Sequence, residues 1–184
     1  GTSRLNRILE HEPADLTVVV QAGATLGKLQ DVLCEKNQFL PLDPPFSENS
    51  TIGGILAANS SGPIRAQFGT ARDRLIGIKV VHANGDVTKG GGKVVKNVSG
   101  YDMNKLYTGS LGTLGVIVEA AFKVSPLFKE RRTLIIPCNS VEEASHLSFG
   151  IQKSGIEPLA LQLLDGGILD VIQKPTGFVC SDMH

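Results

Sequence analysis

The sequence has no tryptophan, few other aromatic residues and no excess of charge of either sign. Its 184 residues include 2 tyrosines and 7 phenylalanines, and 18 basic side chains balance 18 acidic ones. A surface for nucleic acid needs a basic patch, and single strands also need aromatic rings on which bases stack. The composition therefore argues against a nucleic acid as partner.

Long apolar runs and closely spaced cysteines are also missing. No segment approaches the roughly 20 apolar residues that cross a bilayer, and no basic segment followed by an apolar one opens the chain. We therefore expect no membrane span, no secretory leader and a cytoplasmic location. The cysteines form no CxxC pair and no metal-ligand spacing, which predicts free, buried thiols at Cys34, Cys138 and Cys180.

Candidates for catalysis and metal binding are sparse. The four histidines lie far apart, and none shares a ligand spacing with a cysteine or a carboxylate. None stands in a pattern typical of a serine–histidine–aspartate triad either. The sequence therefore predicts no metal site and indicates no catalytic residue among His11, His82, His146 and His184.

Local patterns at the start of the chain predict a strand followed by a helix. Residues 1–15 are polar and mixed and show no clear period, whereas 16–20 form a β-branched run typical of a buried strand. Thr25 is a suitable N-cap for an amphipathic helix that extends to about Lys36. A strand, a short turn and a helix in this order indicate a chain that mixes both kinds of element.

A hairpin and a further strand are predicted later in the chain. The pair Asn84-Gly85 is typical of a type I′ turn, and it separates apolar or β-branched segments at 76–83 and 86–89. The apolar segment 116–124 follows a glycine-rich stretch and ends before a proline, which predicts a strand.

The character of the sequence changes after Pro126. Ser140 and Glu143 form a capping box at the start of an amphipathic helix. Apolar segments at 133–136 and 159–164 predict strands on either side of this helix, so the three elements form a βαβ unit. We therefore expect two domains, over residues 1–125 and 126–184.

Glycine-rich segments match neither of two common nucleotide-binding patterns. Gly109, Gly112 and Gly115 recur every three residues and lead into a strand, whereas the dinucleotide fingerprint has another spacing and opens a helix. The glycines before Lys93 resemble a phosphate loop, but Val94 stands where that loop needs serine or threonine.

Glycine-rich turns that lead into regular elements still allow backbone N–H groups to approach an anionic ligand. The segments 51–54 and 57–62 are of this kind, and a pyrophosphate is the expected ligand. Each glycine taken singly is better explained by a tight turn. The whole set in this order favours a binding surface.

These motifs resemble the FAD-binding domain of the vanillyl-alcohol-oxidase (PCMH-type) flavoprotein family. The resemblance is dense from about Asp15 to Pro126. Within the family, residues 93–102 look most like the E subunits of glycolate oxidases. The segments that carry the resemblance are Leu40–Pro45, Thr51–Asn59, Ser61–Pro63, Phe68–Asp73 and Gly109–Ile117.

The resemblance implies that FAD lies in a groove between two subdomains. This chain would be the second subdomain, an α+β unit with a mixed or antiparallel sheet and helices. The first subdomain, which carries its own glycine-rich phosphate loop in such proteins, is expected to be missing. Residues 126–184 would be the start of a ferredoxin-like cap domain that is cut short.

The resemblance also implies roles for individual residues. The Pro-rich loop would approach the flavin, and the segments after Ser50 would line the phosphates and the ribityl chain. Asp73 and Asp102 would hold loops in place, because an ionised carboxylate beside a pyrophosphate is unfavourable. The implied FAD-binding residues are Pro41, Leu42, Asp43, Pro44, Ser50, Thr51, Gly53, Gly54, Asn59, Gly62, Gly69, Tyr101, Gly112, Gly115, Val116 and Ile117.

The activity implied by the resemblance is oxidation of a 2-hydroxy acid to a 2-oxo acid, with FAD as the electron acceptor. Expected partners are other oxidase subunits, or a second copy that covers the place of the missing subdomain. The alternative is a truncated or split subunit that keeps the scaffold, does not bind FAD alone and is not catalytic. Loss of half the groove motivates this alternative, since both walls contribute binding energy.

Overall fold

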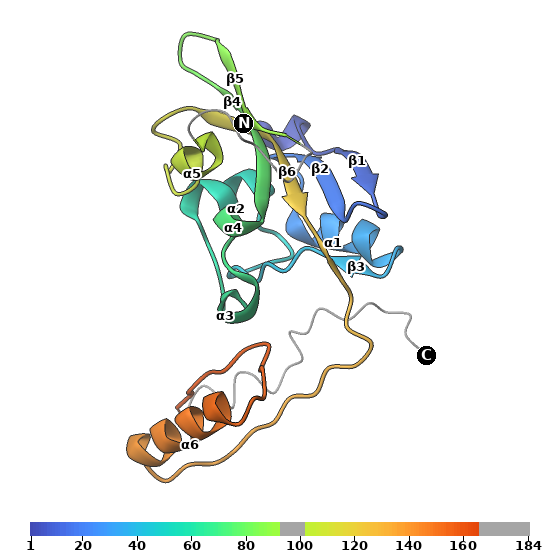
Figure 1. The fold of residues 1–184 in the computed structure, drawn as a ribbon. Coiled ribbons are helices and arrows are strands. Elements are labelled where there is room, and N and C mark those ends of the chain that lie inside the picture. Colours follow the sequence, from blue (N-terminus) through green and yellow to red (C-terminus); the bar gives the residue numbers. More distant parts are fainter. Residues whose placement is uncertain (93–101, 166–184) are drawn as a thin grey trace. The chain divides into compact units, whose positions relative to one another are not determined.

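The computed structural model describes residues 1–92 and 102–165, which fall into two units (Figure 1). The first unit comprises Gly1–Leu127, and the second begins at Phe128. Among the described residues, the first unit contains every strand and the second contains the helix α6 (Val141–Lys153).

One sheet of five strands forms the body of the first unit. Its strands lie in the order β1-β2-β6-β4-β5, and every neighbouring pair is antiparallel. The prediction of an α+β fold with an antiparallel sheet is therefore confirmed. The strands are β1 (Ile8–Glu12), β2 (Thr17–Gln21), β4 (Leu75–Val81), β5 (Val87–Gly91) and β6 (Val116–Lys123).

The core lies between one face of this sheet and two helices, α1 (Leu26–Cys34) and α2 (Ile52–Ala58), which contribute buried leucine and isoleucine side chains. Phe122 of β6 is 0 % exposed and stands opposite Val18 of β2. Strand β6 pairs with β2 on one side and with β4 on the other. The packing around Phe122 therefore joins the two halves of the sheet.

The opposite face of the sheet carries a row of polar groups. Lys79 of β4 forms an ion pair with Glu119, its cross-strand neighbour in β6, and Gln21 of β2 stands on the other side of Glu119. The Gln21 side chain accepts a hydrogen bond of 3.1 Å from the backbone N–H of Arg7. Cross-strand pairs of opposite charge favour one register, so polar contacts support the same alignment of β2, β6 and β4 as the core does.

Short elements complete the first unit. β3 (Gln38–Phe39) pairs with β7 (Ser125–Pro126) in a second, two-stranded sheet. No helix within the two described ranges is long and apolar enough to cross a bilayer. The remaining helices of this unit are η1 (Thr2–Arg4), α3 (Arg65–Phe68), α4 (Ala71–Arg74) and α5 (Met103–Tyr107).

The elements with strong local signals lie where the sequence predicts them. Thr25 caps α1 by accepting a hydrogen bond from the backbone N–H of Lys28. The predicted strands 16–20 and 116–124 correspond to β2 and β6. Strand β1 was not predicted, because this edge strand is mostly exposed and its polar residues hide the alternation on which such predictions rest.

The turn between β4 and β5 differs from the predicted type. The N–H of Gly85 donates to the carbonyl of His82 at 3.0 Å, and the N–H of His82 donates to the carbonyl of Asp86. Gly85 has a φ of +89°, whereas Asn84 is not among the residues with positive φ. The loop therefore has three residues and one left-handed glycine, a common hairpin form, and the type I′ prediction is wrong. The Asn84 side chain instead accepts a hydrogen bond from the N–H of Asp86.

In the second unit the helix is confirmed and the strands are not. The Ser140 hydroxyl accepts a hydrogen bond of 3.2 Å from the N–H of Glu143 at the start of α6. The structure assigns no strand to 133–136 or 159–164. Leu134 is 81 % exposed, and no other described segment pairs with its backbone. A strand needs such a partner for its N–H and C=O groups, so apolar composition alone was a poor guide.

The prediction of three free, buried thiols is wrong at Cys34, which is disulfide-bonded. Cys138 is free and only half-buried. Cys180 lies outside the described residues.

Candidate cofactor site

Three of the predicted segments meet near the C-terminal end of α2. The N–H of Gly109 donates to the carbonyl of Leu56 at 2.9 Å, and the N–H of Leu111 donates to that of Ala57 at 2.8 Å. These bonds hold the glycine-rich loop 109–115 against α2. The Pro-rich loop 40–45 reaches the same region through the side chain of Asp43.

Asp43 bridges the Pro-rich loop and the loop that follows α2. Its Oδ1 accepts a hydrogen bond of 2.9 Å from the N–H of Gly62, and its Oδ2 accepts one of 3.1 Å from the N–H of Ile64. Desolvation by burial raises the pKa of Asp43 above its ordinary value, against the lowering effect of the two amides and of the Arg65 charge. The carboxyl is therefore committed to contacts within the chain.

Most other side chains of the Pro-rich loop are buried, and Pro45 at its end is exposed. Pro41, Leu42 and Pro44 lie in the interior, and Leu42 belongs to the core cluster. Buried Gln30 of α1 fixes the start of the loop, because its side-chain amide exchanges hydrogen bonds of 2.7 and 3.0 Å with the backbone of Leu40. A ligand beside residues 41–44 would therefore meet mainly backbone atoms.

The N–H groups at the start of α2 have partners within the chain. The N–H of Ile52 donates to the carbonyl of Ala24 at 2.9 Å, and that of Gly53 donates to the carbonyl of Ala22 at 2.7 Å. The Thr51 hydroxyl accepts a hydrogen bond of 3.2 Å from the N–H of Gly54. The sequence pattern suggested that these amides bind a phosphate. In the structure they already donate hydrogen bonds within the chain. Their role is to attach α2 to the segment after β2.

The two glycines of this turn have different surroundings. A Cβ on Gly53 would lie 2.9 Å from the Cβ of Ala22 and 3.1 Å from its carbonyl oxygen, so the close approach of α2 to this segment requires glycine. A Cβ on Gly54 would meet only the Thr51 hydroxyl, at 3.0 Å. Gly54 is exposed, which leaves the surface above it open.

Two serines that were not among the predicted site residues carry buried hydroxyl groups. Ser61 lies two residues after Asn59, which ends α2 in a left-handed conformation with a φ of +48°. Ser110 lies in the loop held against α2. Neither hydroxyl oxygen has a hydrogen-bond partner among the described residues. Because an unpaired buried hydroxyl costs about 1–3 kcal/mol, water or a ligand is expected to complete the hydrogen bonding of both.

The remaining predicted residues are spread around this region. Gly112 is exposed with a φ of +78°, and Gly115 precedes β6 with a φ of +151°. Val116 is exposed, whereas Ile117 belongs to the core. The Ser50 hydroxyl donates to two carbonyls of its own loop, Gly69 ends α3, and Tyr101 lies outside the described residues.

Asp102 is the N-cap of α5 and Asp73 lies in the capping box of α4, so both carboxylates stabilise helix N-termini, as expected for residues that hold loops in place. The side chain of Asp102 caps α5 and accepts from the N–H of Lys105. Asp73 completes a capping box at α4, where its Oδ2 accepts from the N–H and the hydroxyl of Thr70 at 2.7 and 2.8 Å.

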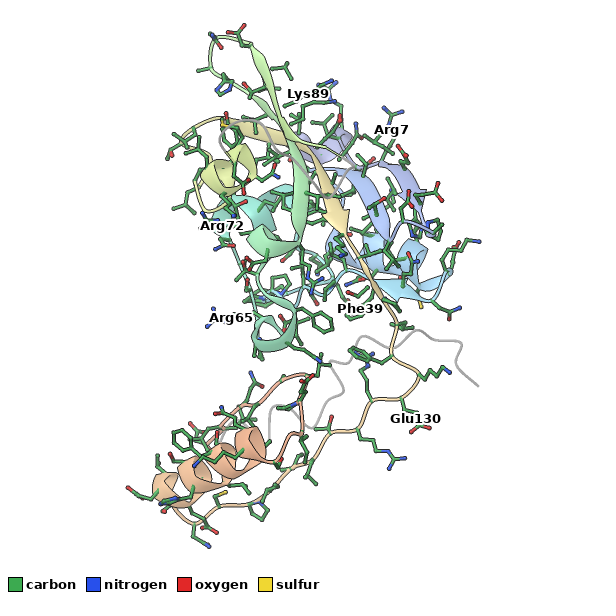
Figure 2. The ribbon with its side chains drawn as sticks, viewed as in Figure 1. Arg7, Phe39, Arg65, Arg72, Lys89 and Glu130 are labelled. Atoms are coloured by element: carbon green, nitrogen blue, oxygen red, sulfur yellow. The ribbon has the colours of Figure 1, made fainter. Side chains whose placement is uncertain are left out.

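Figure 2 labels the exposed side chains of Arg65 on α3 and Arg72 on α4, two cations on consecutive helices.

Replacing Asp73 by alanine is expected to cost about 1 kcal/mol of stability or less, because the residue is exposed and the loss is that of a helix cap. The hydrogen bonds from Thr70 lower the pKa of Asp73 below 3.8 in the folded chain. The stabilisation is therefore present above the unfolded value and is lost as the pH falls through the folded one. Urea unfolding of both proteins from pH 7 to pH 3 tests this: the difference is expected to shrink as the pH falls below 3.8, and a difference as large at pH 3 as at pH 7 contradicts it.

Comparison with known proteins identifies the domain. The family described as an FAD binding domain matches residues 1–91. Glycolate oxidase subunit GlcD of Bacillus subtilis is 38 % identical over 92 % of this chain and 36 % of its own length. The mitochondrial D-lactate dehydrogenase (cytochrome) of Arabidopsis thaliana is 34 % identical over 95 % of this chain and 30 % of its own. Glycolate oxidase subunit GlcE of Escherichia coli is 37 % identical over 65 % of this chain and 34 % of its own.

A solved structure agrees with these relatives. Alkyldihydroxyacetonephosphate synthase superposes with a TM-score of 0.61 at 30 % identity, and the match covers 70 % of this chain and 23 % of that one. The chain spans about a third of the length of the curated relatives it matches.

The arrangement of the site is consistent with FAD, the cofactor of this domain family. FAD carries phosphate and hydroxyl groups, and these can pair with the hydroxyls of Ser61 and Ser110, which have no partner among the described residues. Both flank the end of α2, where the three motif segments meet. The motifs, the antiparallel sheet and the matching domain family agree, and the chain resembles the PCMH-type FAD-binding flavoproteins.

Proposed function

We propose that this chain forms FAD-binding structure in an oxidoreductase that converts a 2-hydroxy acid to a 2-oxo acid. The observation that carries the proposal is the set of curated relatives, which includes glycolate oxidase subunits and D-lactate dehydrogenases. Glycolate and lactate are both 2-hydroxy acids. The structurally similar synthase shows that the fold alone does not select the reaction, so the substrate class rests on the relatives.

In this proposal the residues of the chain bind and orient the cofactor. The hydroxyl groups of Ser61 and Ser110 form hydrogen bonds with FAD, and the exposed backbone around Gly112 lies beside the cofactor. Gly53 and Asp43 do not touch it but hold the loops that do. Bound FAD would accept a hydride from the substrate carbon, and the chain supplies position and electrostatics for that step.

Partners follow from the same relatives. Two of them are named as subunits of glycolate oxidase, so we propose that the protein works with further oxidase subunits or with a second copy. The E-subunit assignment implied by the sequence motifs stays a proposal, because GlcD and GlcE match at nearly the same identity. The segment 93–101, on which that assignment partly rests, lies outside the described residues.

The first test is retention of FAD. The purified chain is incubated with FAD, desalted and examined by visible absorption. We expect the flavin bands to remain with the protein at a near-stoichiometric ratio. A colourless protein contradicts FAD binding by this chain alone and favours a role that depends on a partner or is not catalytic.

The second test is reduction of the bound flavin without oxygen. Glycolate, D-lactate and L-lactate are added separately, and bleaching of the flavin band is followed. We expect bleaching by at least one 2-hydroxy acid, with a difference between the lactate enantiomers because a chiral site distinguishes them. Retained FAD that none of the three reduces would leave binding intact and contradict the proposed activity of this chain.

A further inference from the structure

Two loops that face the proposed cofactor position are connected by one carboxyl group. Asp43 belongs to the Pro-rich loop, and the amides that it accepts from belong to Gly62 and Ile64, in the loop after α2. The partners lie 19 and 21 residues away along the chain. The hydroxyl of Ser61 stands directly before the first of these amides.

The contact is close enough to fix the spacing of the loops. A Cβ on Gly62 would lie 2.1 Å from the carbonyl oxygen of Asp43 and 2.4 Å from its Cγ. The backbone of one loop therefore touches the backbone and the carboxyl of the other. Both oxygens of the carboxyl are used, one for each amide, so a group with a single acceptor cannot replace it.

We propose that Asp43 is a positioning residue: its carboxylate ties the Pro-rich loop to the loop after α2 and thereby places Ser61 for the cofactor. The proposal rests on the proposed binding of FAD. The motif implied that Asp43 contacts the cofactor. The proposal instead gives Asp43 the role of fixing the distance between the two loops. Such a role also avoids placing an anion beside the pyrophosphate.

The bridge itself is tested without cofactor. The amide proton resonances of Gly62 and Ile64 are followed by NMR as the pH is lowered. Both are expected to shift together with one inflection above pH 3.8, because burial raises the pKa of Asp43. The positive charge of Arg65 on α3 lowers the pKa of this carboxyl, but burial has the larger effect. In Asp43→Asn the inflection is expected to vanish, and amide resonances that do not titrate in the wild-type chain overturn the proposal.

The effect on binding is tested by FAD titration of matched variants. Asp43→Asn keeps one acceptor and loses the other, and we expect its dissociation constant for FAD to rise at least about tenfold. Asp86→Asn is the control, because Asp86 is exposed in the β4–β5 turn and contacts Asn84 there. Its affinity is expected to equal that of the wild type.

The outcomes separate the proposal from the function on which it rests. If the amides of the wild-type chain titrate but Asp43→Asn binds FAD as tightly as the wild type does, the positioning role is overturned. Conversely, a wild-type chain that retains no FAD contradicts the proposed function, and the amide titration still decides whether the carboxylate joins the two loops. Asp43→Glu serves as a second variant if the asparagine variant does not fold, since it keeps both acceptors but displaces them by one methylene group, and the same loss of affinity is expected.

Discussion

Replacing Phe122 by alanine is expected to lower the free energy of unfolding by about 3–5 kcal/mol. Phe122 is fully buried in the central strand and packs between the sheet and the helices. Its removal leaves a cavity at the place where β6 joins β2 to β4. Such a loss is a large part of the stability of an ordinary domain, so much of the chain is expected to be unfolded at 37 °C.

Urea unfolding at 25 °C, followed by circular dichroism, measures this loss. Phe46→Ala is the matched control, because Phe46 is 86 % exposed in the loop before Ser50. Its effect is expected to stay within about 0.5 kcal/mol. Equal effects of the two substitutions would show that β6 does not hold the core as described.

Replacing Gly62 by alanine is expected to be the most damaging single methyl addition in the candidate site. The added Cβ would overlap the carbonyl oxygen of Asp43, which belongs to backbone and cannot rotate away. Overpacking of this kind costs about 1–3 kcal/mol. Because the two loops must separate to make room, we also expect the variant to lose its affinity for FAD.

Gly150→Ala adds the same methyl group on α6, at an exposed position where no atom beyond the adjoining helix residues lies within 4 Å of the added Cβ. It is expected to leave FAD retention unchanged and to alter stability by no more than about 1 kcal/mol, in the favourable direction for a helix. Thermal unfolding and FAD titration of both variants provide the comparison. If Gly62→Ala binds FAD as tightly as Gly150→Ala does, the spacing of the two loops is not important for binding.

The sequence was sufficient for elements with strong local signals. The β-branched run before Gln21 and the threonine cap before α1 act within a few residues, so neighbouring side chains decide the outcome. Strand β1 was missed because it is an exposed edge. The strands predicted around α6 failed for a related reason, since pairing depends on residues elsewhere and not on the segment itself.

The site was predictable as a set of segments and less so in its details. Motifs located the Pro-rich loop, the α2 turn and the loop 109–115, and the structure brings these together. It also shows that the amides of 52–54 are already paired, whereas the hydroxyls of Ser61 and Ser110 have no partner within residues 1–92 and 102–165. Hydrogen-bond partners 19 residues or more apart leave no local pattern in a sequence, so only the fold reveals them.

The order of the strands determines when this fold can form during synthesis on the ribosome. Strand β2 ends at residue 21, but its partner β6 begins only at residue 116. The first 91 residues, which match the FAD-binding family, therefore leave the ribosome with an unpaired β2 edge and an incomplete core. Because the pairing of distant segments must overcome a large loss of chain entropy, folding is expected to be slow and to begin only after β6 has emerged. Until then the nascent chain exposes apolar strands that chaperones recognise.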